Sequence, residues 1–198
     1  MKKIFKILLL FLPLCSNAQS PVINIKNQDG FPITDAYYKD IDQVLNPFEG
    51  TYLYTNGTTF LKVVLEKKIM SFDGFKYSDL LIGEYQYVEN GIEKINTLYL
   101  LSSFYSENQH RHSIHGNFPL TIGDEICVGC TVNEFRILSS LVELSTDNLA
   151  QIIISKTLVN GHDAIKLNIW WQLRTKKENE PPLPQASLPG GDWVLLKQ

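Results

Sequence analysis

The segment LLIGEYQYVENGIEKINTLYLL, residues 80–101, decides the fold class of this chain. Apolar, β-branched and aromatic residues dominate residues 80–89 and again residues 92–101, and such residues pack well on a pleated, half-buried surface. Asn90-Gly91 separates the two runs, and this dipeptide favours the type I′ turn that joins two antiparallel strands. The segment therefore predicts a β-hairpin.

The same pattern recurs along the chain. Residues 151–159 and 164–173 flank Asn160-Gly161 and predict a second hairpin. Residues 132–144 fit both a helix face and a strand, and we favour a strand because strands surround them. Strands are predicted over residues 51–55, 58–67, 80–89, 92–101, 149–158, 164–174 and 192–197.

Alternation in the last long strand indicates which residues face a core. Ile165, Leu167 and Ile169 fall on one face of this strand, whereas Lys166 and Trp170 fall on the other. An outward Trp170 is either an ordinary surface aromatic, or a residue that covers a barrel mouth or meets a ligand or partner.

Two further segments complete the fold prediction. Residues 36–45 carry apolar residues at helical spacing after a capping Asp35, and Asn46-Pro47 would end a short helix there. Residues 176–191 are rich in proline and form a predicted loop that returns the apolar residues 193–196 to the sheet. We expect a mainly β chain that forms a single antiparallel β-barrel or strongly curved sheet, lipocalin- or calycin-like, with a short N-terminal helix.

The N-terminus has the features of an export signal. Three lysines within residues 2–6 precede the apolar run 7–14, and Ser16-Asn17-Ala18 is a cleavage site of small residues. The run is shorter than the roughly 20 residues that cross a bilayer. Cys15 offers lipidation as the alternative to cleavage after Ala18, although Leu14 before it is large for that reaction. The protein is predicted to be periplasmic or secreted, or else lipid-anchored to the outer membrane at Cys15.

Length and charge limit the classes of function. We divide the chain into a signal peptide (1–18), an extended segment (19–34) and a single β-rich domain (35–198). Without the signal the formal charge is −6, because residues 1–18 carry three of the 18 basic residues and none of the 21 acidic ones. Nucleic-acid binding needs clustered lysine and arginine, so it is not expected.

Two resemblances follow from particular residues. Residues 46–54, NPFEGTYLY, are similar to the Gly-x-Trp start of the first strand in lipocalin-like and fatty-acid-binding-protein-like barrels, with Tyr52 in place of tryptophan. Residues 36–42, 48–52 and 80–87 together resemble a family of small exported proteins of flavobacterial type, known only as a domain of unknown function. The first resemblance implies a barrel that holds one small ligand, and the second implies no catalytic residue.

A histidine cluster is the strongest candidate for chemistry. His110, His112 and His115 lie within six residues, and in an extended segment the first two point the same way. Three imidazoles and a water would form an open zinc site able to activate water. The alternative is a solvated polar loop.

Cys127 and Cys130 form a Cys-x-x-Cys motif with several interpretations. In an exported protein a disulfide is expected, whereas free thiols, a redox dithiol or a zinc site shared with the histidines remain alternatives. A thioredoxin-like site would need a βαβ unit, which the sequence does not predict.

These features leave three functions open. The favoured one is an exported, non-enzymatic, lipocalin-like protein that binds a small apolar or amphipathic ligand, without a cofactor. The second is a cell-envelope module that binds proteins or glycans by its surface. The third is a zinc-dependent hydrolase using residues 110–115. Catalysis is left open, because Gly-x-Ser-x-Gly and phosphate-binding loops are absent from the sequence but triads assemble from distant residues.

Overall fold

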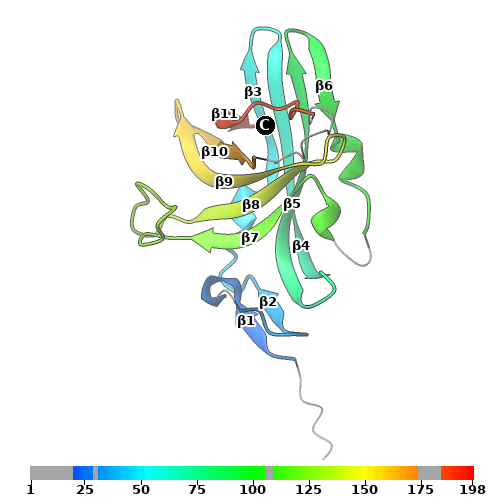
Figure 1. Cartoon of the computed structure of the whole chain (residues 1–198). Helices are drawn as coiled ribbons and strands as arrows, with labels where there is room; N and C mark the ends of the chain where they lie inside the picture. Colours follow the sequence, from blue (N-terminus) through cyan, green and yellow to red (C-terminus); the bar gives the residue numbers. More distant parts are fainter. Residues whose placement is uncertain (1–19, 29–30, 106–108, 174–183) are drawn as a thin grey trace, which may run out of the picture.

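The computed structural model describes residues 20–28, 31–105, 109–173 and 184–198 (Figure 1). The strands are β1 (Val22–Asn24), β2 (Tyr37–Lys39), β3 (Gly50–Asn56), β4 (Thr59–Phe72), β5 (Tyr77–Glu89), β6 (Ile92–Asn96), β7 (Ile114–Leu120), β8 (Arg136–Glu143), β9 (Asn148–Val159), β10 (His162–Trp171) and β11 (Gly191–Lys197). Short 3-10 turns are η1 (Ile25–Asn27), η2 (Asn46–Phe48), η3 (Leu98–Leu100) and η4 (Gln109–Arg111). Within these ranges no helix has the length and apolar character needed to cross a bilayer.

Eight strands close into an antiparallel barrel, which confirms the predicted fold class. The order around the barrel is β5-β4-β3-β11-β10-β9-β8-β7, and β7 pairs back with β5. Full closure removes the unpaired edges that an open sheet would expose. The C-terminal strand β11 fits between β10 and β3, so the chain end does return to the sheet as predicted.

Strand β5 shares its second edge among three partners. One edge pairs with β4 along almost its whole length. The other edge meets β2 at Tyr77 and Ser78, then β7 at residues 81–83, and then β6 at residues 86–89. The barrel, the N-terminal strands and the β5–β6 hairpin are therefore all fixed by this one strand (Figure 1).

The inward side chains form one continuous buried cluster. At one mouth the Trp193 ring packs against Tyr54 and Tyr87, with ring centres 5.0 and 5.8 Å away. The cluster contains Ile25, Leu45, Phe48, Tyr52, Leu61, Val63, Leu65, Leu81, Tyr85, Tyr87, Ile114, Ile137, Leu141, Ile152, Ile154, Ile165, Leu167, Ile169 and Leu195, among others. The row Leu61, Val63 and Leu65 and the row Ile165, Leu167 and Ile169 thus both face the core, as alternation predicts.

Both predicted hairpins are present. Asn90 and Asn160 each have a φ of 52°, the left-handed conformation that the first position of a type I′ turn requires. Strand β8 confirms the strand reading of residues 132–144, although only residues 136–143 are extended. The strand predicted over residues 92–101 ends early, at Asn96, because the Thr97 hydroxyl donates to the Tyr85 carbonyl and accepts from the Tyr85 amide.

The helix predicted over residues 36–45 is not formed. Residues 37–39 are strand β2, Asp35 has a φ of 59° instead of a capping conformation, and the only helical turns nearby are η1 and η2. The buried Asp40 carboxylate accepts hydrogen bonds from the amides of Val44 and Leu45, at 2.7 and 3.0 Å. An aspartate that satisfies local amides in this way stabilises a turn in competition with a helix.

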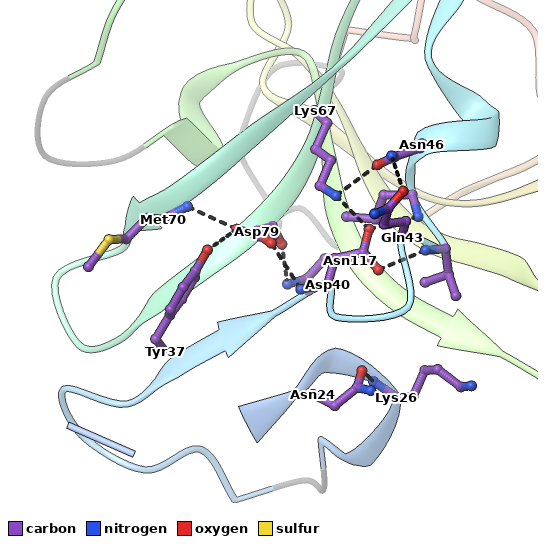
Figure 2. A network of polar contacts seen from close by, with 12 residues as sticks. Asn24, Lys26, Tyr37, Asp40, Gln43, Asn46, Lys67, Met70, Asp79 and Asn117 are labelled. Atoms are coloured by element: carbon purple, nitrogen blue, oxygen red, sulfur yellow. Dashed lines mark hydrogen bonds and ion pairs between the residues drawn. The ribbon is translucent and has the colours of Figure 1, made fainter. Parts of the chain in front are cut away.

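A second buried carboxylate attaches this segment to the barrel, as Figure 2 shows. Asp79 of β5 accepts hydrogen bonds from the Tyr37 hydroxyl and from the amides of Asp40 and Met70, at 2.5, 2.9 and 3.0 Å. Lys67 of β4 pairs with Asp40 at 2.8 Å. The N-terminal segment is therefore held on the barrel end by bonds that are shielded from water.

Closure of the barrel predicts that one glycine, Gly116, cannot be replaced without a loss of stability. A Cβ on Gly116 would lie 2.6 Å from the Cα and Oγ of Ser139, so Gly116→Ala would force β7 away from β8. We expect the free energy of unfolding to fall by roughly 1–3 kcal/mol in urea titrations. Leu158→Ala, at a 66% exposed position, is the control and should change it by less than about 0.5 kcal/mol. Equal stability of the two variants would contradict the tight seam.

Candidate functional site

The outer face of β7, β8, β9 and β10 carries two adjoining hollows, which we call the apolar hollow and the imidazole hollow. The apolar hollow has a volume of about 350 Å³ and is lined by Glu125, Ile126, Val128, Leu138, Gln151, Ile153 and Trp170. The imidazole hollow has a volume of about 290 Å³ and is lined by His110, His115, Gly116, Asn117, Phe118, Leu138, Ser139, Ser140 and Gln151. Leu138 and Gln151 belong to both, so the hollows are neighbours on one surface.

Strand register aligns the lining residues in rows. Trp170 of β10 is opposite Gln151 of β9, Gln151 is opposite Ser140 of β8, and Ser140 is opposite His115 of β7. Directly opposed residues in antiparallel strands have Cβ atoms about 4.5–5.5 Å apart. One continuous row therefore links the exposed indole of Trp170, 52% accessible, to the imidazole of His115.

A second row next to the first is apolar. Leu138 is opposite Ile153 on one side and opposite Phe118 on the other. Leu138 and Ile153 also pack with Leu120 and with the two cysteines in a small cluster outside the barrel core. The outer wall therefore combines a polar row with an apolar row one pleat away.

The loop between β7 and β8 forms the side of the apolar hollow. Cys127 and Cys130 are joined by a disulfide, and Cys127 is 5% exposed. Arg136 of β8 donates from Nη1 to the Val128 carbonyl at 3.1 Å, which ties the loop to the sheet. Val128 and Ile126 stay 82% and 50% exposed beside Trp170, so the loop presents apolar side chains to solvent.

His110 and His115 meet in the imidazole hollow. Their rings are edge to face with centres 5.1 Å apart. Nδ1 of His115 lies 3.0 Å from the His112 carbonyl; since a carbonyl can only accept, Nδ1 carries the proton and Nε2 is left as an acceptor. Burial, followed by the neighbouring His115, lowers the pKa of His110 to about 4, and burial also lowers the pKa of His115. Both imidazoles are therefore neutral at pH 7.

His112 points elsewhere. Its ring is fully buried, with Nδ1 2.9 Å from Glu84 Oε1 and Nε2 3.3 Å from Gln109 Oε1. The expectation that His110 and His112 point the same way is wrong, because residues 109–111 form the 3-10 turn η4 and not an extended strand. Within the described ranges no three histidine, cysteine, aspartate or glutamate residues are grouped as metal ligands. A zinc site remains a prediction that this geometry does not favour.

The structure thus brings together features that the sequence offered separately. Trp170, the cysteine pair and two of the three histidines lie on one outer wall. Gln151, Ser140 and Leu138 were not expected there, since only strand register places them between these features. Cys15 lies outside the described residues.

The chain belongs to a family of unknown function, DUF6705, whose model matches residues 1–198. This membership confirms the resemblance to a domain of unknown function. The comparisons with curated proteins and with solved structures gave no match.

The buried imidazoles predict a pH dependence of stability. Between pH 6.5 and about 4, histidines in the unfolded chain take up protons that folded His110 does not, so the folded state loses stability as the pH falls. The loss approaches about 1.4 kcal/mol per pH unit for such a group. Urea unfolding at pH 7.5, 6.5, 5.5 and 4.5 measures it, and His110→Gln should show a shallower decline. Parallel curves for wild type and variant would rule out this role of His110.

Proposed function

We propose that the protein is an exported, non-enzymatic barrel that binds a small amphipathic ligand on its outer wall, across the apolar and imidazole hollows. The observation that supports this most is the cross-strand row from Trp170 to His115, with the apolar row of Leu138 and Ile153 beside it. A half-exposed tryptophan next to the buried Ile153 and the partly buried Leu138 offers apolar contact area that water otherwise covers.

The outer wall suits a ligand better than the barrel interior does. The resemblance to lipocalins implies an interior site, but the inward side chains form one buried cluster, and Trp193, Tyr54 and Tyr87 pack together at one mouth. A small barrel is either filled by its side chains or holds a ligand. The packing of this interior favours the filled case, which moves the proposed site to the outside.

The chemistry of the two hollows indicates the class of ligand. The apolar hollow would take an aliphatic or aromatic group between Val128, Leu138 and Trp170. The imidazole hollow offers neutral hydrogen-bonding groups, namely two imidazoles, the Ser140 hydroxyl and the amides of Asn117 and Gln151. Such groups match an uncharged polar head, for example a hydroxyl or amide. Each hollow is near the lower end of the size range of small-molecule sites, about 300–1,000 Å³, so a ligand of moderate size would use both.

A neutral apolar dye tests the apolar hollow directly. N-phenyl-1-naphthylamine should bind the wild-type protein with a rise in dye fluorescence, and Trp170→Ala should weaken this binding about tenfold because the largest apolar surface is removed. Val128→Asp, at an exposed position, should weaken it similarly by placing a charge in the wall. Fluorescence titration gives the dissociation constants.

The control is Tyr99→Ala, which removes an aromatic that is 75% exposed and belongs to neither hollow. It should bind the dye like the wild type. If Trp170→Ala and Tyr99→Ala bind the dye equally well, the proposed site is wrong. If Trp170→Ala alone weakens dye binding, native mass spectrometry of protein from its own host can identify a natural ligand, which should be lost in Trp170→Ala.

The disulfide gives a separate prediction. Reduction of Cys127–Cys130 should lower the affinity for the dye by several-fold, because the loop bearing Ile126 and Val128 then depends on the Arg136 contact to stay over the strands. Dye titration with and without dithiothreitol measures this, and Cys127→Ser/Cys130→Ser should bind like the reduced protein in both buffers. Unchanged affinity after complete reduction would show that the disulfide does not shape the hollow.

A further inference from the structure

One end of the molecule gathers exposed apolar side chains, and we call this end the apolar tip. It comprises the ends of β1 and β2, the segment before β2, and the end of β4 with the β4–β5 turn, all at the lower end of the molecule in Figure 1. Its side chains are Val22, Phe31, Ile33, Ile69, Met70 and Phe75, which are 44–85% exposed. Apolar side chains gathered on one exposed surface indicate an interaction site more strongly than scattered ones do.

Hydrogen bonds hold these segments side by side. The Asp35 amide donates to the Phe75 carbonyl at 2.8 Å, and the Ala36 amide donates to the Ile33 carbonyl at 3.2 Å. Val22 is the register partner of Tyr37 in the parallel pair β1–β2. These contacts bring residues 22, 33 and 75 to one place.

Hydrogen bonds to Asp79 bring the end of β4 to the same place. The Tyr37 hydroxyl and the Met70 amide both donate to Oδ1 of Asp79, as Figure 2 shows. Met70 has a φ of 54° at the irregularity of the β4–β5 pairing between Lys68 and Ser71, and this local bend leaves Ile69 and Met70 74% and 56% exposed. The tip is therefore built on the buried network that fixes the N-terminal segment, so its apolar side chains are presented by a rigid base.

Charge at the tip favours an apolar partner. Lys76 lies over the Tyr38 ring at 4.4 Å, and Asp73 accepts from the amides of Phe75 and Lys76, so positive and negative groups alternate in the turn. Lys68 is paired with Glu66 at 2.8 Å, and Lys26 with Asp42 at 3.2 Å. A partner that relied on charge would find little net charge here, so the contact that the tip offers is mainly apolar, and the acyl-headgroup boundary of a bilayer is a surface that takes up apolar side chains.

The place of β1 in the sequence points to the same partner. Val22, the first residue of β1, follows closely after Cys15, the residue that a lipid would modify. Seven residue steps separate Cys15 from Val22 and span at most about 25 Å. In the lipid-anchored form that the sequence leaves open at Cys15, the tip would be the part of the domain held near the membrane.

We propose that the apolar tip docks on a lipid bilayer, with Ile33, Ile69 and Phe75 entering the boundary between headgroups and acyl chains. The docking does not depend on the outer-wall hollows or on the ligand proposed for them. Because it rests on apolar insertion, it should be similar on neutral and anionic lipids and should persist at high salt.

Sedimentation with vesicles tests the proposal. The chain from residue 19 onward, which lacks both the apolar run 7–14 and Cys15, is mixed with vesicles of phosphatidylcholine, or of phosphatidylcholine with 30% phosphatidylglycerol, in 0.1 and 0.5 M NaCl. We expect it to sediment with both kinds of vesicle. Adding Ile69→Ser/Phe75→Ser should lower the partition coefficient at least about tenfold, since two apolar side chains are lost from the contact.

A matched control is available on the same sheet. Ile92 is 62% exposed at the opposite end of β5 from the tip, so Ile92→Ser makes the same chemical change as Ile69→Ser away from the proposed contact. Circular dichroism melting confirms that each variant is folded. Equal binding by the tip variant and by Ile92→Ser overturns the proposal, and so does binding only to anionic vesicles at low salt. Dimerisation through the tip without vesicle binding, seen by size exclusion, also overturns it.

Discussion

The structure depends on how β5 divides its second edge. Within thirteen residues this edge pairs with β2, then with β7, then with β6. The pairing with β7 covers only residues 81–83, yet it closes the barrel. Gly83 lies in this short ladder, and it also lets β5 pack closely on β4, because a Cβ there would lie 2.6 Å from a Leu65 methyl and 2.7 Å from the Val64 carbonyl, both on β4. Loss of this short ladder would open the barrel, whereas the N-terminal segment is held separately by the pairing of β2 with β5 and by Asp79.

Glu84 shows how the seam is kept where the edge passes from β7 to β6. Its side chain points outward but is fully buried, and Oε1 accepts the Ser113 amide at 3.3 Å and contacts His112 Nδ1 at 2.9 Å. Removing one partner of such a buried pair lowers the free energy of unfolding by more than the pair itself contributes. The reason is that the remaining polar group stays buried without its hydrogen-bond partner. His112 therefore fixes the start of β7 on β5, and His115, three residues later, is carried onto the outer wall.

Local chemistry made the hairpins and the alternating rows predictable. Asn90-Gly91 and Asn160-Gly161 specify their turns without help from the rest of the chain, and outward Trp170 follows from the period of two in β10. Strand β7, by contrast, contains Gly116 and Pro119, and only its pairing with β5 and β8 makes it a strand. The absent helix at residues 36–45 has a local and a long-range cause, since Asp40 satisfies the nearby amides of Val44 and Leu45 and also meets Lys67 and Asp79, which lie far away in the sequence. The two hollows depend on these long-range pairings and could not be derived from the sequence.

Some aromatic residues of this chain fill the interior of the barrel, and others are exposed on its outer surfaces. Tyr52, Tyr85 and Tyr87 point inward at no more than 2% exposure, which leaves the barrel with a core in place of a cavity. The domain gains no stability from leaving Trp170 and Val128 exposed on one wall, or Phe75 exposed at one end, and such positions tolerate polar substitution. Exposed apolar side chains on surfaces that buried bonds and a disulfide hold in place suit recognition of another molecule, and they support the proposal that such recognition takes place on the outside of the barrel.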